Sequence, residues 1–149
     1  MKPYVVLHMI TSIDGRIDTS LWPEFLEPSK TYESIHSELH GDAWLIGTNT
    51  LLEYCGEDTV TTSTSQSIPR SNWTVSKPVG KRFAVAFDRY GKSELTDSLM
   101  DGDVPIMVLS EQVSDSYLAK LRSNGVSYIF AGKDAIDICT AIELLHSIF

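Results

Sequence analysis

Short apolar runs separated by polar, turn-forming segments recur along the chain and predict a sheet of buried strands. The first run, residues 4–10, is continuous apart from His8 and is rich in β-branched residues. This composition is typical of a central strand that is buried on both faces. Further runs of the same kind predict strands at residues 43–46, 83–87, 106–109 and 127–130.

Apolar residues at helical spacing lie between these runs and predict helices. The expected helices are one capped by Ser29 with Tyr32, Ile35 and Leu39, a brief one from Thr48, one capped by Ser114 with Tyr117, Leu118 and Leu121, and one after Asp134 and Asp137 with Ile138, Ile142, Leu145 and Phe149. Almost wholly apolar strands that alternate with helices predict a single α/β domain over residues 1–149, with a mainly parallel sheet.

The segment between residues 56 and 81 has a different composition from the rest of the chain. It is polar and of low complexity, and it contains Pro69, Pro78 and Gly80. Because such a sequence buries little apolar surface, we expect a flexible flap here.

Charge and cysteine content exclude several classes of function. The 149 residues carry a formal net charge of −8 at pH 7, so nucleic acid and anionic membranes are not expected as partners. Cys55 and Cys139 are too few for a disulfide framework and too far apart for a metal knuckle, which favours a reducing compartment. No apolar run approaches the ~18 residues of a membrane span. We therefore expect a cytoplasmic protein.

Two polar stretches that follow predicted strands carry the candidate chemistry. In the first, residues 8–18, the pair Asp14-Gly15 is either a simple turn or part of a substrate site. In the second, residues 47–50, a helix would begin in the sequence Gly-Thr-Asn-Thr. These residues are either an ordinary helix cap or an anion site built from free backbone N–H groups.

The histidines leave one alternative open and exclude another. His8 is either a core histidine with satisfied nitrogens or a group that orients or protonates substrate, because histidine titrates in the useful range. His36 and His40 are spaced for a metal, but no third ligand completes a set, so we expect no metal site. The sequence contains neither a Gly-x-Gly-x-x-Gly fingerprint nor a Walker loop.

Three motifs, at residues 9–17, 42–51 and 83–91, each join an apolar run to a polar turn. Together they resemble the dihydrofolate-reductase-like family typified by the C-terminal reductase domain of the riboflavin biosynthesis deaminase-reductase. Residues 9–17, MITSIDGRI, are similar to its first-strand motif, and residues 42–51, DAWLIGTNTL, to its cofactor-diphosphate turn. Residues 83–91, FAVAFDRYG, are similar to its strand and turn near the adenosine ribose. The resemblance implies a three-layer fold with helices on both faces of the sheet.

The resemblance also implies an activity: hydride transfer from NADPH to a small amino-pyrimidine or related heterocycle, as in an aminouracil reductase. Its implied catalytic residues are His8 and Asp14. Its implied cofactor-binding residues are Thr11, Ser12 and Trp22 beside the nicotinamide, Gly47, Thr48, Asn49 and Thr50 at the phosphates, and Arg89 at the 2′-phosphate. The residues alone leave Arg89 either as this phosphate ligand or as a solvated turn residue.

The family pattern continues past residue 149 with a strand that ends in a Glu-Gly-Gly type loop. We therefore expect this chain to lack a C-terminal part of the reductase domain and to form a homodimer through its unpaired sheet edge. The alternative is a non-catalytic nucleotide-binding or oligomerising remnant of the fold.

Overall fold

The computed structural model describes residues 3–18, 20, 22–23, 27–57, 67–76 and 81–148. The chain divides into two compact units. We call Tyr4–Gly41 the N-terminal unit, and Asp42–Phe149 together with Met1–Pro3 the sheet unit. Each unit is described by itself.

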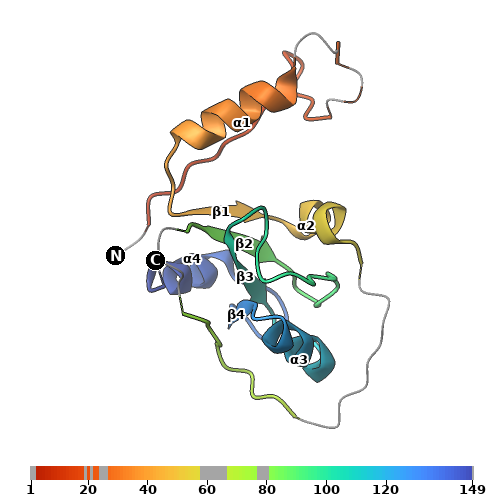
Figure 1. The fold of residues 1–149 in the computed structure, drawn as a ribbon, viewed down its shortest axis with the longest axis vertical. Coiled ribbons are helices and arrows are strands. Elements are labelled where there is room, and N and C mark those ends of the chain that lie inside the picture. The colour runs from red at the N-terminus through yellow and green to blue at the C-terminus, as the bar shows by residue number, and fades with distance from the viewer. Residues whose placement is uncertain are drawn as a thin grey trace. The chain divides into compact units, whose positions relative to one another are not determined.

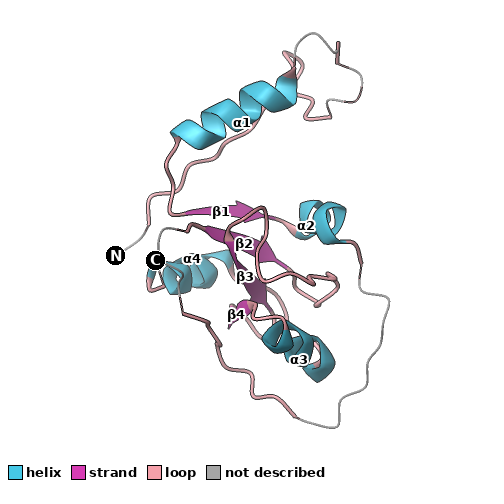
Figure 2. Ribbon diagram, in the orientation of Figure 1, coloured by secondary structure: helices cyan, strands magenta, loops and turns pink. Residues whose placement is uncertain are grey.

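The sheet unit contains a four-stranded sheet in the order β1-β2-β3-β4, and every strand pair is parallel (Figures 1 and 2). The elements, with α1 in the N-terminal unit, are α1 (Pro28–Glu38), β1 (Ala43–Ile46), α2 (Thr48–Cys55), β2 (Phe83–Phe87), β3 (Val104–Leu109), α3 (Asp115–Ser123), β4 (Ser127–Phe130) and α4 (Ile138–His146). The predicted α/β class and parallel sheet are confirmed, and β3 begins two residues earlier than the sequence predicts.

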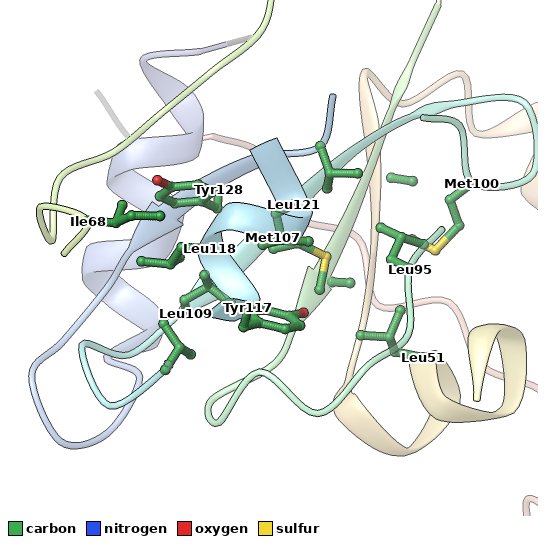
Figure 3. Close-up of a cluster of buried hydrophobic side chains, with 14 residues drawn as sticks. Leu51, Ile68, Leu95, Met100, Met107, Leu109, Tyr117, Leu118, Leu121 and Tyr128 are labelled. Atoms are coloured by element: carbon green, nitrogen blue, oxygen red, sulfur yellow. The ribbon is translucent and has the colours of Figure 1, made fainter. Parts of the chain in front are cut away.

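Side chains that alternate along the strands face two different hydrophobic clusters, as the period of a strand requires. On one face Ala84, Met107 and Tyr128 pack with Leu51 of α2 and with residues of α3 (Figure 3). On the other face the neighbouring strand residues pack with Ala141 and Leu145 of α4. Helices therefore cover both faces of the sheet, which explains why the strands are apolar throughout.

Side-chain caps begin two of the helices. Ser114 accepts a hydrogen bond from the backbone N–H of Tyr117 at the start of α3, as predicted. Asp137 accepts from the N–H of Thr140 at the start of α4, and this bond lowers the pKa of its carboxyl group. The N-terminal unit differs from prediction, because the residue before α1 is Glu27 in a left-handed conformation and Ser29 lies inside the helix.

The face that α4 buries differs from the predicted stripe. Ala141 and Leu145 are buried, and Ile142 packs partly against them. Ile138, the first residue of the helix, is 65% exposed although it lies on the same face as Ala141 and Leu145. Phe149, the last member of the predicted stripe, lies outside the described residues.

Residues 67–76, which we call the strap, were expected to belong to a flexible flap but pack on the sheet. Trp73 forms an antiparallel bridge with Tyr128 of β4, with N–H to carbonyl distances of 2.9 and 2.8 Å. Ile68 is buried, and Arg70 bonds the carbonyls of Glu111 and Val113. The contacts of Ile68, Arg70 and Trp73 thus hold the strap on the sheet although the segment is polar. The strap covers the outer edge of β4. Residues 58–66 and 77–80 of the expected flap lie outside the described part of the chain.

The predicted first strand is wrong. Residues 4–10 are not in a strand, and Tyr4 and Leu7 are 93% and 85% exposed. A strand needs a neighbour that takes its backbone hydrogen bonds, and the described residues of the N-terminal unit contain no strand. Residues 4–10 therefore remain without regular structure, and most of their side chains are exposed.

Candidate functional site

The carboxyl ends of β1 and β2 are joined by a single hydroxyl. Thr48, the first residue of α2, donates from Oγ1 to the carbonyl oxygen of Phe87 at 2.7 Å. Phe87 is the last residue of β2, so this bond holds the start of α2 against the end of the neighbouring strand. Parallel α/β sheets bind ligands at this end of their strands.

The N-terminus of α2 presents backbone donors at the same place. The first intrahelical bond joins the N–H of Leu51 to the carbonyl of Gly47. The N–H groups of Thr48, Asn49 and Thr50 precede that bond and point out of the helix end, where an anion is stabilised. Gly47 has φ −84° and ψ 172°, an extended conformation open to any residue, and a Cβ at this position would have no heavy atom within 4 Å. Neither the turn nor local packing accounts for a glycine here.

Arg89 follows β2 at the same end of the sheet. Its Nε donates to the carbonyl of Asp134 at 2.8 Å, and its guanidinium lies 4.7 Å from the ring centroid of Tyr90. Its backbone carbonyl accepts a bond from the hydroxyl of Ser110 at 2.7 Å. The exposed arginine is thus held from the loops that follow β3 and β4.

A buried carboxylate supports this turn from behind. Asp88 is fully buried and accepts bonds from the backbone N–H groups of Lys92 and Ser93 and from the hydroxyl of Tyr117. Burial, together with the negative charge of Asp88, raises the pKa of Tyr117 far above its usual value. Asp88 therefore fixes the backbone that carries Arg89.

The loop 131–137 after β4 is rigidly built. The Gln112 side chain donates to Oδ1 of Asp134 at 3.0 Å and to the carbonyl of Lys133 at 3.4 Å. Gly132 has φ +146°, and a Cβ there would lie 1.9 Å from the carbonyl oxygen of Ala135. The sequence did not predict Ser110, Gln112 or Asp134 as site residues. Each lies within about four positions of the end of an apolar strand, which was the available signal.

The predicted substrate-side residues lie in the N-terminal unit. Ser12 and Gly15 close a tight turn through a 2.9 Å bond from the N–H of Gly15 to the carbonyl of Ser12. Asp14 accepts from the Ser12 hydroxyl and pairs with Nε of Arg16 at 3.0 Å. The pair Asp14-Gly15 thus forms the turn that was one of its two interpretations. Thr11 is exposed and Trp22 is half-buried.

His8 stacks on the aromatic ring of Tyr32, with centroids 4.1 Å apart and planes 9° from parallel. The ring of His36 lies further along, 6.3 Å from that of His8. Nδ1 of His8 is covered from solvent and has no hydrogen-bond partner. His8 is therefore not a core histidine with two satisfied nitrogens. Its role in orienting or protonating substrate stays a prediction.

The predicted site residues therefore fall into two groups, one in each unit. Gly47, Thr48, Asn49, Thr50 and Arg89 lie in the sheet unit at one end of the strands. The described residues hold no group of three or more His, Cys, Asp or Glu side chains arranged for a metal ion. Within the same part of the chain, no helix has the length and apolar character to cross a membrane.

Comparison of the sequence with protein-family models and with curated proteins finds no match.

Proposed function

We propose that the protein is an NADPH-dependent reductase of the dihydrofolate-reductase-like type, which transfers hydride to a small amino-pyrimidine or related heterocycle. The observation that carries the proposal is the Thr48 bond to the carbonyl of Phe87. It places the N-terminus of α2 and the turn bearing Arg89 at the same end of two adjacent parallel strands.

A dinucleotide fits the donors at this end of the sheet. The diphosphate would bind at the N–H groups of Thr48, Asn49 and Thr50, where the helix dipole favours negative charge. The open space in front of Gly47 would let a phosphate approach the backbone closely. Because the chain carries a net charge of −8, such an anion depends on these local donors for its affinity.

Arg89 is the residue proposed for the 2′-phosphate of NADPH. A guanidinium presents paired N–H donors to a phosphate. Its Nε is already occupied by the carbonyl of Asp134, so its terminal nitrogens are the donors that would meet the phosphate.

The redox chemistry would reside in the nicotinamide, with the protein supplying position and electrostatics. In this proposal Thr11, Ser12 and Trp22 orient the nicotinamide ring. His8, whose Nδ1 is without a partner, or Asp14 orients or protonates the substrate. These five residues belong to the N-terminal unit.

NADPH binding tests the proposal directly. Titration with NADPH should quench tryptophan fluorescence and raise the thermal midpoint, with a stabilisation of about 2.7 kcal/mol at a ligand concentration of about 100 times Kd. Arg89→Ala should weaken the binding of NADPH far more than the binding of NADH. The matched control is Arg82→Ala, which removes the same charge before β2, at the opposite end of the strand. A folded protein that gives no signal with millimolar NADPH would refute the proposed cofactor.

Turnover is tested separately, with an amino-pyrimidine substrate and the absorbance of NADPH as readout. Loss of NADPH that depends on substrate supports the reductase. Tight NADPH binding without turnover supports the second candidate, a non-catalytic nucleotide-binding or oligomerising domain.

One observation favours the second candidate. Among the described residues of the sheet unit, no strand pairs with the outer edge of β1, and residues 43–52 carry no charge that would block pairing. Leu45, in the middle of β1, is partly exposed. A dimer joined at this edge should appear in light scattering at twice the chain mass of 16.6 kDa, and Leu45→Lys should dissociate it.

A further inference from the structure

The loops that follow β2, β3 and β4 are connected by side-chain bonds into one assembly. Ser110 donates from Oγ to the carbonyl of Arg89 and accepts from the N–H of Gln112 at 3.3 Å. Gln112 in turn donates to the carboxylate of Asp134, and Arg89 donates to the carbonyl of that residue. The position of Arg89 thus depends on residues in both of the following loops.

Arg89 is held on two sides. Its Nε bonds the Asp134 carbonyl, and its guanidinium lies over the ring of Tyr90. A long side chain that is already ordered loses less conformational entropy when it binds a ligand. The bond from Nε of Arg89 orders the arginine only while the carbonyl of Asp134 keeps its position.

The backbone on either side of Asp134 is fixed by its own bonds. The N–H of Asp137 donates to the carbonyl of Ala131 at 2.6 Å, and the N–H of Glu111 donates to the carbonyl of Gly132 at 3.0 Å. Between these points the Gln112 amide holds Asp134 by its side chain. Gln112 therefore stabilises the orientation of the one carbonyl that receives Arg89.

The carboxylate of Asp134 gives Gln112 a second effect. A carboxylate and a phosphate compete for the same guanidinium, because each accepts paired N–H bonds from it. Gln112 is a neutral donor that occupies Oδ1 of Asp134. Without that bond, Asp134 is free to turn toward the terminal nitrogens of Arg89.

From this geometry we propose that Gln112 is a positioning residue that sets the preference for NADPH over NADH. It acts by holding Asp134, so that the Asp134 carbonyl orients Arg89 and the Asp134 carboxylate stays away from it. The inference rests on the proposed function, because it assigns a role in binding the 2′-phosphate.

The test compares Kd for NADPH and for NADH, measured by tryptophan fluorescence on the whole chain. Gln112→Ala should raise Kd for NADPH about tenfold, the size of one lost charge-assisted bond. Its Kd for NADH should stay within about twofold of the wild-type value. Glu111→Ala, an exposed neighbour in the same loop, is the control and should leave the ratio of the two constants unchanged. The ratio is informative because a merely structural loss would weaken both nucleotides alike.

Two further variants sharpen the result. Gln112→Glu, which places a carboxylate against that of Asp134, should reduce the NADPH preference at least as much as Gln112→Ala. In Gln112→Ala/Asp134→Ala the competing carboxylate is gone, and part of the preference should return, since residues in one network are not additive.

The outcomes separate the two proposals. If the wild-type protein binds NADPH and the Gln112 variants keep its preference, or weaken both nucleotides equally, the role of Gln112 is overturned and the proposed function stands. If the folded wild-type protein binds neither nucleotide, the proposed function fails and the role of Gln112 fails with it.

Discussion

The hydroxyl of Tyr117 in α3 lies 3.0 Å from Oδ2 of Asp88, the residue that follows β2. Asp88 is fully buried and Tyr117 is 4% exposed. The bond joins a helix to the turn that carries Arg89, so the candidate phosphate side of the site is supported from inside the core.

Removal of that hydroxyl should destabilise the fold. Tyr117→Phe takes one donor from a buried carboxylate, for which we expect a loss of about 1–3 kcal/mol in urea-induced unfolding. Tyr90→Phe changes an exposed ring and should stay within about 0.5 kcal/mol of the wild type. Equal effects of the two substitutions would show that the Asp88 bond contributes nothing.

The same hydroxyl should make the free energy of unfolding decrease at alkaline pH. Burial raises the pKa of Tyr117 in the folded state, so the neutral phenol favours folding. This contribution is complete below the unfolded-state pKa of about 10 and is lost as pH rises above it. Stability measured from pH 9 upward should therefore fall less steeply in Tyr117→Phe than in the wild type.

Asp115 should contribute to acid sensitivity. The Arg70 side chain and the N–H of Ile68 bond its carboxylate and lower its pKa. A lowered folded-state pKa gives stability that is present above the unfolded-state value of about 3.9 and is lost as pH falls below it. Asp115→Asn and Arg70→Ala should each flatten the decline of stability below about pH 4. A decline of unchanged steepness in both variants would contradict this assignment.

Gly132 should tolerate alanine less well than Gly102, another glycine of positive φ. Its Cβ would meet the Ala135 carbonyl at 1.9 Å, whereas a Cβ at Gly102, with φ +82°, would meet nothing within 4 Å. Gly102→Ala should therefore cost only backbone strain of about 1–3 kcal/mol. Gly132→Ala should cost more, because the loop must also move. Thermal unfolding of the two variants tests this prediction. A smaller loss of stability in Gly132→Ala than in Gly102→Ala would refute it.

The strap should protect β4 from solvent. Oδ1 of Asn72 accepts a 2.9 Å bond from the N–H of Phe130. Asn72→Ala should speed hydrogen exchange at that amide and cost about 1 kcal/mol. Ser71→Ala, an exposed neighbour, should leave the exchange rate unchanged.

The sequence predicted those features that local pattern determines. The apolar runs located the four strands, because three of them are largely buried and β1 is partly buried. Ser114 was identifiable as a cap before Tyr117. The run at residues 4–10 has the same composition, yet it forms no strand, because a strand also requires a neighbour and composition does not specify one. The strap was missed for the converse reason, since Ile68 and Trp73 lie within a polar segment and pack on residues far away in the chain.

The candidate site divides in a similar way. Gly47 and Thr48 were predicted because they directly follow an apolar run, and Arg89 because its motif resembles a family turn near the adenosine ribose. Parallel strands bring their carboxyl ends to one edge. The bonds of Gln112 and Asp134 were not identifiable, because they join single polar residues of loops separated by 22 positions. Such bonds depend on strand order and loop shape, which only the folded chain specifies.

The strap has a further consequence for self-assembly. A sheet propagates into a filament only if each copy offers two edges that can pair. Here the strap occupies the outer edge of β4, so within the described residues of the sheet unit only β1 is available. Association through the sheet would therefore stop at a pair of chains. The antiparallel contact between Trp73 and Tyr128 would prevent a further copy from pairing with β4.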